Sequence, residues 1–359
     1  MKPFLFEILS GRTLFGEGSL EEIGKETEKL NGSRTLIIST PRQKELNERI
    51  SDLLGKRCAG IYTDVIQHVP IETVEKAMET VNELEIDSLV AVGGGSTVGL
   101  AKAIALQKPI PIIAIPTTYS GSEMTSVWGI TENGYKTTGK NPNVKPQTVI
   151  YDPLLTTSLP TYLTIVSGVN ALAHCVEALY AKNSNPITSI MAQEGIQSLY
   201  NGLPKVVANP REISSRSEVL YGAWLSGTVL GSVEMALHHK LCHVLGGSYK
   251  LPHAETHTVI LPYVIAYNAK YAPSAVQAIS KSIGIDRDDV AGTLFDLIKS
   301  FGVKTSLAEI GMRENDLDEA AEFVIRNPYY NPRPVDQKSI RILLENAYTG
   351  ARPGIELKI

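Results

Sequence analysis

The chain has 359 residues, of which 43% are hydrophobic and 20% are charged, and its formal net charge is −4. This length exceeds the size at which one hydrophobic core usually stops growing, so two domains are expected. The composition is typical of a soluble globular protein. Because the chain lacks the basic excess that phosphate backbones require, nucleic acid is not an expected partner.

Cysteine content and apolar runs indicate the cellular compartment of the chain. The three cysteines are Cys58, Cys175 and Cys242. They are few and unclustered, which indicates a reducing compartment such as the cytoplasm and argues against a disulfide framework or a thiolate metal site. The apolar stretch 4–9 is broken by Glu7 and has no small-residue cleavage signal, so no signal peptide is expected. The longest apolar run, 259–267, contains Pro262 and is too short to span a bilayer, so no membrane partner is expected.

The first part of the chain alternates strand-like apolar runs with helical periodicity. Strands are predicted at 35–39, 89–92 and 112–115, and apolar positions between Ile71 and Leu84 trace one face of a helix. A strand, helix, strand order of this kind implies parallel pairing with right-handed crossovers. We therefore predict an α/β nucleotide-binding domain with a parallel sheet over residues 1–157.

From about Pro160 the pattern changes, because strand signals nearly vanish and 3.6-residue periodicity dominates. Helices are predicted around 187–203 and 340–347. The join is placed near Tyr151–Pro153, where proline resists the continuation of a helix. Residues 158–359 are therefore predicted to form an all-α domain that carries the substrate and the catalytic groups.

A glycine turn follows the second predicted strand. Gly93, Gly94 and Gly95 let the backbone approach a ligand closely, and the helix that starts near Ser96 directs free N–H groups at an anion. A pyrophosphate fits such a turn, although Val98 occupies the third glycine position of the dinucleotide fingerprint. A purely structural turn is the alternative.

A second loop, rich in hydroxyl groups, follows the third predicted strand. Its candidate cofactor-binding residues are Thr117, Thr118, Ser120 and Ser122. Ligands of open parallel sheets collect beyond the carboxyl ends of the strands, so two such loops can form one floor. The alternative is a helix start that Ser120 or Ser122 caps and that Glu123 favours through the helix dipole.

Spaced polar residues in the second half predict a catalytic pocket. The candidates are Asn170 and His174, His239 and His243, and His253. The first four form two pairs at i, i+4, and each pair shares one helix face. A single histidine is more often structural, but two matched pairs and His253 together favour a site.

Other residues of this region are interpreted differently. His238 and His257 have no spacing partner and are interpreted as structural. The segment from His239 to His243 superficially matches a metallopeptidase helix, but Lys240 stands where the glutamate base is required, which excludes that activity.

Several motifs resemble those of a known family in order and spacing over nearly the whole chain. They are residues 93–96, 116–118, 121–123, 152–153 and the spaced histidines. This set is similar to the iron-containing (group III) alcohol dehydrogenases. Within that family, residues 239–247, 252–255 and 331–334 resemble the maleylacetate reductases.

The resemblance implies an activity: reduction of the carbon-carbon double bond of maleylacetate to 3-oxoadipate with NADH or NADPH, in the degradation of aromatic compounds. It also implies a homodimer. Lys136 matches a family lysine near the nucleotide, and Thr40 stands where many relatives have an aspartate that receives the adenosine ribose. Without that negative charge, and with Arg42 nearby, both NADH and NADPH remain open.

The resemblance also assigns roles to the spaced residues. The family's metal ligands, Asp, His, His and His, fall on Asn170, His174, His239 and His253, and the additional active-site histidine falls on His243. A neutral amide attracts a divalent ion less than a carboxylate does, so no obligatory metal is expected.

Fixed cations and a proton donor complete the expected chemistry. A small dicarboxylate substrate needs cations, and Lys240 and Arg333 are the candidates, although a single lysine or arginine is more often a solvated charge. Hydride addition to the alkene would generate an enolate, to which His243, helped by His253 or His239, would donate a hydrogen bond or a proton.

Three rival functions remain open from the residues. The nearest is a metal-dependent alcohol or aldehyde dehydrogenase of the same family. A lyase or synthase that keeps NAD tightly bound is the second, and a nucleotide-binding regulator without catalysis is the third.

Overall fold

The computed structural model describes residues 4–6, 11–132, 135–285 and 289–358. Part of the apolar stretch 4–9 lies outside these residues. The chain forms two compact units, which are Glu7–Leu159 with Arg211–Leu220, and Met1–Phe6 with Pro160–Pro210 and Tyr221–Ile359. We call them the nucleotide unit and the helical unit. Across the described ranges, no helix is long and apolar enough to cross a membrane.

A six-stranded parallel sheet forms the core of the nucleotide unit, as predicted. Its strands are β1 (Arg12–Phe15), β2 (Thr35–Ile38), β3 (Cys58–Tyr62), β4 (Ser88–Gly93), β5 (Ile112–Pro116) and β8 (Thr148–Tyr151), in the order β1-β8-β5-β4-β2-β3. The three predicted strands are β2, β4 and β5, which are buried along their whole length. The sequence analysis missed β1 and β3, which are partly exposed edge strands, and the four-residue β8.

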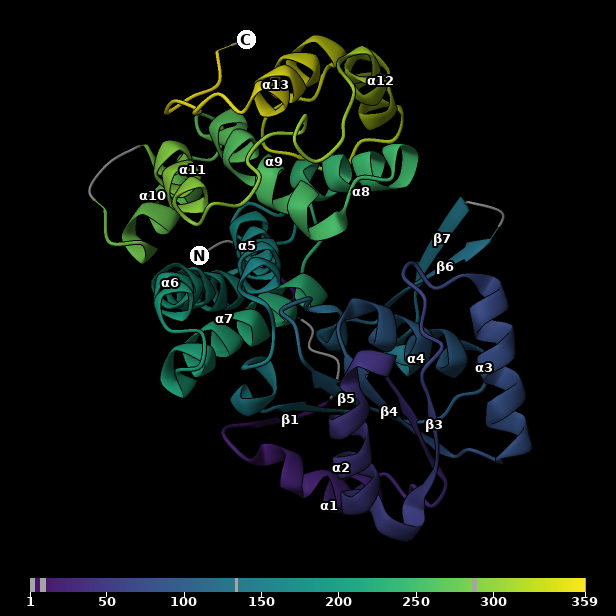
Figure 1. Ribbon diagram of the computed structural model, residues 1–359. Coiled ribbons are helices and arrows are strands. Elements are labelled where there is room, and N and C mark those ends of the chain that lie inside the picture. The colour runs from purple at the N-terminus through teal and green to yellow at the C-terminus, as the bar shows by residue number, and fades with distance from the viewer. Residues whose placement is uncertain (1–3, 7–10, 133–134, 286–288, 359) are drawn as a thin grey trace. The chain divides into compact units, whose positions relative to one another are not determined.

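Helices cover both faces of the sheet (Figure 1). On one face, α1 (Ile23–Lys29) and α2 (Lys44–Leu54) pack their apolar sides against alternate residues of the central strands. On the other face lie α3 (Ile71–Glu83) and α4 (Gly95–Gln107), which contact each other. A parallel sheet buried on both faces requires strands that are apolar throughout, and this is what β4 and β5 show.

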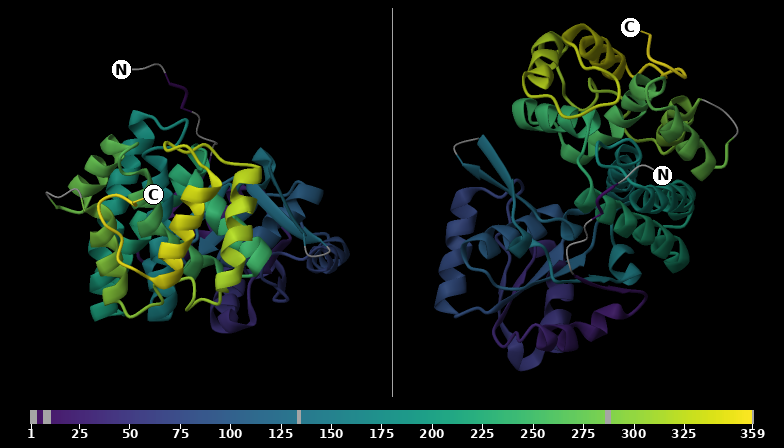
Figure 2. Two further views of the ribbon diagram at one scale, coloured as in Figure 1. Left: turned by 90° about the horizontal axis from the view of Figure 1, so that it is seen from above. Right: turned by 180° about the vertical axis from the view of Figure 1, so that it is seen from behind.

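A β-hairpin that the sequence analysis did not predict adjoins α3 and α4. It consists of β6 (Val127–Glu132) and β7 (Tyr135–Lys140), which pair in antiparallel fashion. The right-hand view of Figure 2 shows it from behind, next to α3. Thr131 ties it to the loop after β3, because its N–H donates to Val69 O at 3.0 Å and its hydroxyl donates to His68 O at 2.8 Å.

The regular elements described in the helical unit are all helices, which confirms the predicted class. The main ones are α5 (Thr161–Ala178), α6 (Pro186–Ala208), α7 (Ile213–Ser232, whose start belongs to the nucleotide unit), α8 (Leu237–Tyr249), α9 (His253–Asn268), α10 (Pro273–Ser282), α11 (Val290–Ser300), α12 (Leu317–Arg326) and α13 (Gln337–Thr349). Helix α5 is mostly buried and packs on α6 and α9. The close approach of α5 to α6 needs Gly168, since a Cβ there would lie 2.6 Å from Leu203 Cδ2. Figure 2 shows the yellow α12 and α13 beside the green α8 and α9.

Candidate active site

The glycine turn of the nucleotide unit is a tight connection between β4 and α4. Gly93 has φ +142°, which side-chain-bearing residues rarely adopt. A Cβ at Gly93 would lie 2.8 Å from Thr97 Oγ1, and one at Gly94 would lie 2.8 Å from Thr118 Oγ1. At Gly95 the nearest atom is 3.7 Å away, which is ordinary contact. The first two glycines are therefore required by the fold itself, and the third leaves open backbone at the start of α4.

The loops that follow β2, β4 and β5 meet at the carboxyl edge of the sheet. Thr117 N donates to Gly93 O at 3.0 Å, and Gln43 Nε2 donates to Thr117 Oγ1 at 3.3 Å. Gln43 closes the short turn that begins after Thr40. Ser96 lies in the first turn of α4, where backbone N–H groups have no partner within the helix. Free N–H groups at the start of a helix are suited to bind an anion. Contacts with a cofactor stay a prediction for Thr40, Ser96, Thr117 and Thr118.

Two of the candidate hydroxyls are engaged by the protein. Ser120 Oγ accepts a hydrogen bond from Ser122 N at 3.3 Å and donates to Glu123 at 3.3 Å. The 3₁₀ turn Ser122–Met124 has Gly121 at its N-cap and no side-chain cap, so neither serine is the helix cap that the alternative expects. Ser122 contacts the buried Lys102, whose Nζ donates to Ser122 O at 2.7 Å, Ser122 Oγ at 3.4 Å, Thr125 Oγ1 at 2.9 Å and Val127 O at 2.9 Å. Burial lowers the pKa of Lys102 to about 7. The sequence did not reveal this lysine, because its position on α4 has no distinguishing motif.

Lys136 lies on β7 of the hairpin, and its stem passes over Gly129 of the paired strand. A Cβ built on Gly129 would lie 2.9 Å from Lys136 Cε. Desolvation lowers the pKa of Lys136, and desolvation together with the charge of Lys136 lowers the pKa of His68. Of the two lysines on β7, Lys136 is therefore close enough to His68 to act on it electrostatically.

The spaced histidines of the helical unit lie in one cluster. Ring centroids are 5.1 Å apart for His174 and His239, 6.1 Å for His239 and His243, 5.0 Å for His239 and His257, and 4.5 Å for His253 and His257. His174 and His239 are buried, and His243 and His253 are exposed. The structure thus brings together side chains from α5, α8 and α9, and their catalytic roles stay a prediction.

Asn170 and His174 lie one turn apart on α5. His174 Nδ1 is 3.0 Å from Ser226 Oγ, and that hydroxyl donates to Ala171 O at 2.7 Å. Since the hydroxyl has one proton, it accepts from His174, which is therefore protonated at Nδ1 and has its lone pair at Nε2. Burial and the charges of neighbouring histidines lower the pKa of His174 well below 6.5. Asn170 Oδ1 is buried and has no hydrogen-bond partner among the described residues.

Glu177 is a buried carboxylate in this cluster that the sequence analysis missed. It lies on α5, three residues after His174 and seven after Asn170, so all three share one helix face. Its Oε2 is 2.7 Å from His239 Nδ1, and the carboxylate also accepts from the backbone N–H groups of Ala236 and His238. The spacing Asn-x3-His-x2-Glu was the signal that would have found it.

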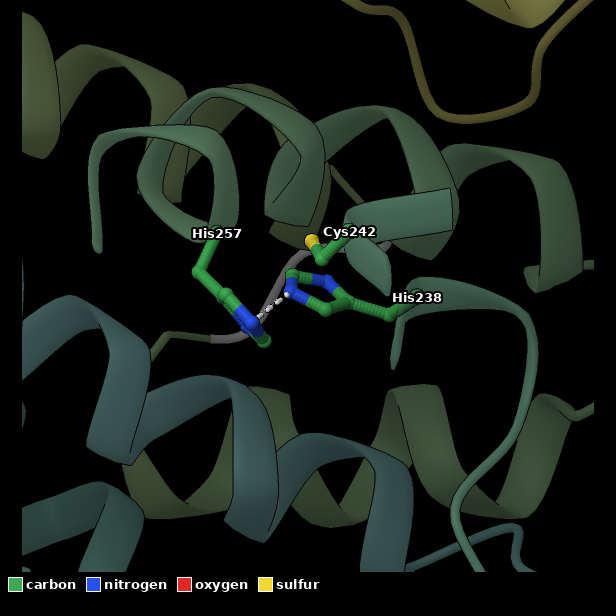
Figure 3. Close-up of side chains that lie close together, drawn as sticks. All are labelled: His238, Cys242 and His257. Carbon is green, nitrogen blue, oxygen red and sulfur yellow. Dashed lines mark hydrogen bonds between the residues drawn. The ribbon is translucent and has the colours of Figure 1, made fainter. Parts of the chain in front are cut away.

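His238 and His257 also belong to the cluster, with Cys242 beside them (Figure 3). His238 Nε2 and His257 Nδ1 are 3.0 Å apart, and donor atoms of all three residues lie within 4.8 Å of one another. All three cysteines are free, as expected, and the turn of α8 places Cys242 one turn after His238. Burial lowers the pKa of both histidines well below 6.5 and raises the pKa of the Cys242 thiol. The three side chains are therefore neutral, and one of the two rings donates its N–H group to the unprotonated nitrogen of the other.

The family positions for a metal lack their acidic ligand in this chain, because Asn170 stands where the family has an aspartate. Among the described residues, the one group of three metal-binding side chains with converging donor atoms is His238, Cys242 and His257, not the set of His174, His239 and His253. Asn170 contributes a neutral oxygen, and the nearby carboxylate of Glu177 is already bonded to His239 and two amides. A divalent cation at these positions would therefore gain less charge attraction than at a site with an aspartate ligand.

Tyr329 links two predicted catalytic residues of α8. Its hydroxyl is 3.2 Å from His243 Nδ1, and Lys240 Nζ lies 5.7 Å from the centre of its ring. Partial burial lowers the pKa of Lys240, and burial together with the charge of Glu177 raises the pKa of Tyr329. The sequence analysis did not identify Tyr329, because a tyrosine in a loop has no periodic signal.

Arg333 lies in the same loop and is held against α9. Its guanidinium is 4.5 Å from the ring centre of Tyr267 and 5.4 Å from that of Tyr271, and Nη1 donates to Tyr267 O at 3.2 Å. Asn331 anchors the loop through two amide hydrogen bonds with Asn268, at 3.0 and 2.7 Å. The cation therefore has a fixed position, which is what bidentate recognition of a carboxylate requires.

Comparison with known proteins identifies the class. Residues 10–153 match the model described as iron-containing alcohol dehydrogenase, and residues 164–348 match the C-terminal model of the Fe-containing alcohol dehydrogenase family. The chain belongs to the iron-containing alcohol dehydrogenase family.

Curated relatives of high identity are maleylacetate reductases. The chain is 48% identical over 353 residues to that of Burkholderia cepacia, covering 98% of this chain and 100% of the relative. It is 49% identical over 350 residues to that of Delftia acidovorans, covering 98% and 99%. Among solved structures, maleylacetate reductase from Agrobacterium tumefaciens matches with TM-score 0.94 and 46% identity, and a putative alcohol dehydrogenase from Ralstonia eutropha matches with TM-score 0.97 and 52% identity, each covering 98% of this chain and 100% of the other.

Proposed function

We propose that this chain reduces the carbon-carbon double bond of maleylacetate to 3-oxoadipate, with NADH or NADPH as the hydride donor, in the degradation of aromatic compounds. The observation that carries the proposal is full-length similarity to maleylacetate reductases, at 48% identity over 98% of the chain for one of them. The histidine cluster with Asn170 in place of an acidic ligand agrees with it. The activity makes the chain an oxidoreductase.

Hydride addition to the alkene carbon β to the ketone places negative charge on the ketone oxygen. Stabilising that charge is the main task of the protein groups. His243 is exposed on α8, and its Nδ1 lies 3.2 Å from the Tyr329 hydroxyl, which orients the ring. We assign to it the donation of a hydrogen bond or proton to the enolate, with His253 and His239 as helpers.

Binding of the two substrate carboxylates falls to Lys240 and Arg333. Arg333 is fixed by Tyr267 and Tyr271 and offers its remaining N–H groups in a planar fork. Lys240 supplies a point charge beside Tyr329, one turn from His243. Each charge-assisted bond contributes about 1.5–3 kcal/mol, which is a large share of the affinity for a small ligand.

The reduced nicotinamide supplies the hydride when it is bound. The glycine turn fits its pyrophosphate, because Gly93 and Gly94 leave the backbone of the turn bare and α4 begins at Gly95. Thr40, without the negative charge of an acidic residue, leaves both cofactors possible. Lys136 is proposed to lie near the nucleotide.

Catalysis without an obligatory metal is part of the proposal. It rests on the neutral donor set, in which no carboxylate is left to bind a cation. The rival metal-dependent alcohol or aldehyde dehydrogenase is not favoured, since curated relatives at 48% and 49% identity are named maleylacetate reductases. A homodimer in the cytoplasm, with no nucleic-acid or membrane partner, completes the proposal.

Isotope transfer tests the function most specifically. Purified protein is mixed with maleylacetate and NADH in which both hydrogens at C4 are deuterium, and the product is analysed by mass spectrometry. We expect net oxidation of NADH and one deuterium on a carbon of 3-oxoadipate. Turnover without net NADH oxidation would indicate the lyase or synthase, and NADH binding without any turnover would indicate a regulator.

A further inference from the structure

We propose that Glu177 is a positioning residue of this site, which holds His239 in one tautomer and fixes the start of α8 with the same carboxylate. The inference rests on the proposed function, since the role of His239 toward a substrate is part of that proposal. Three contacts carry it. Glu177 has no exposed surface, its Oε2 is 2.7 Å from His239 Nδ1 and accepts from Ala236 N at 2.9 Å, and its Oε1 accepts from His238 N at 2.6 Å.

The contacts with the two amides replace a missing helix cap. Helix α8 begins after Ala236, which has no side chain able to accept a hydrogen bond from the first turn. The free N–H groups at the start of a helix need acceptors, and a negative charge there is favoured by the helix dipole. Glu177 supplies both from α5. His239 is the third residue of α8, so the carboxylate that orders the backbone also reaches the ring.

The contact with the ring determines which nitrogen of His239 is open. A carboxylate is an acceptor, so His239 donates through Nδ1–H and Nε2 carries the lone pair. Nε2 is buried and has no partner among the described residues, and the same is true of Asn170 Oδ1. A carboxylate behind an imidazole fixes its tautomer and stabilises the ring once it is protonated. Glu177 thereby prepares Nε2 to accept a hydrogen bond or, when protonated, to donate one to the enolate.

The tautomer of His239 tests this without any substrate, so its failure is distinguishable from failure of the proposed function. Protein labelled with ¹⁵N in histidine gives ring-nitrogen shifts that separate Nδ1–H from Nε2–H, and His239→Gln identifies the signals. We expect a proton on Nδ1 in the native protein. A neutral ring protonated at Nε2 would overturn the proposal whatever the variants do.

The variant Glu177→Gln keeps the shape and removes the charge, and its amide N–H group favours the opposite tautomer. We expect the Nδ1–H signal to be lost and kcat for maleylacetate to fall about 10- to 100-fold, the usual effect of removing such a supporting contact, with the KM for NADH unchanged. Glu177→Asp keeps the charge and should recover part of kcat.

Glu234→Gln is the matched control, because Glu234 is an exposed residue just before α8. It should leave both the tautomer and kcat unchanged. A loss of kcat in Glu177→Gln with an unchanged His239 tautomer would reduce Glu177 to a structural residue, and equal losses in the two variants would overturn the proposal.

Discussion

The candidate sites of the two units consist of different kinds of groups. In the nucleotide unit, the floor consists of backbone and small side chains that follow the ends of β2, β4 and β5, such as Gly93 and Thr117. In the helical unit, the candidate site is a cluster of polar side chains from α5, α8, α9 and one loop. The first site follows from local chain geometry, whereas the second exists only after distant helices have packed together. Damage to the first should therefore alter folding and cofactor binding, and damage to the second should alter the chemistry.

The largest expected effect is on the chemical step, from His243→Ala. Loss of a proton or hydrogen-bond donor should lower kcat for maleylacetate by about 10²- to 10⁴-fold. The KM for NADH and the melting temperature should change little, since His243 is exposed. Steady-state kinetics with both substrates measures this, and near-native kcat would remove His243 from the chemistry.

Substrate binding gives the next effect. Arg333→Ala should raise the KM for maleylacetate about 10- to 100-fold, as expected for one charge-assisted contact of about 1.5–3 kcal/mol. Arg313→Ala serves as the control, because Arg313 is an exposed residue paired with Asp316. If Arg333→Ala changed only thermal stability, its guanidinium would be a brace between Tyr267 and Tyr271 and not a substrate ligand.

These two effects concern the region that the sequence described least completely. The i, i+4 spacings predicted that Asn170 shares a helix face with His174, and His239 with His243, because helix geometry alone determines this. The approach of the two pairs depends on the packing of α5 against α8. Tyr329 has no such spacing, since it belongs to a loop that reaches α8 only in the folded chain. Glu177 lies at helical spacing from His174, but its role depends on its contacts with the backbone of α8. Those contacts form only when α5 and α8 pack together, so the sequence of α5 does not reveal them.

The nucleotide unit was more predictable for the opposite reason. Central strands such as β4 are buried on both faces, so they are continuous apolar runs, and the turn after β4 requires Gly93 whatever lies elsewhere. The edge strands β1 and β3 are partly exposed and lose that signal. The roles of Ser120 and Ser122 depend on the folded turn, because a hydroxyl that bonds within a turn and one that binds a ligand are the same residue in a sequence.

Substitution of glycine in the turn after β4 should have a smaller effect, on the free energy of unfolding of the nucleotide unit, and a neighbouring glycine serves as the control. Gly93→Ala should lower the free energy of unfolding of this unit by about 1–3 kcal/mol, because φ +142° is strained for alanine and the new Cβ meets Thr97. Gly95→Ala, where the space is ordinary, should leave it unchanged or slightly raise it. Urea unfolding followed by circular dichroism measures both, and equal losses would show that the turn does not depend on Gly93.

A pH dependence of stability is expected for the helical unit. The pKa values of His174, His238 and His257 are lowered in the folded state, mainly by burial, whereas the unfolded residues titrate near 6.5. Below pH 6.5 the unfolded chain therefore binds more protons, and stability falls as the pH falls, by up to about 1.4 kcal/mol per pH unit for each group. Urea unfolding between pH 5 and 8 should show this slope below 6.5, and His257→Gln should reduce it. Stability that rose on acidification would contradict a neutral cluster.

The central claim is that the histidine cluster stabilises the enolate without a bound metal ion. The most direct measurement is turnover of maleylacetate by metal-free protein in the presence of a chelator, with metal content determined on the same sample. Asn170→Asp, which restores the anionic ligand, serves as the control that shows iron or zinc can be detected. The account predicts undiminished turnover of the native chain without metal, and turnover that is abolished by chelation and restored by iron or zinc would contradict it.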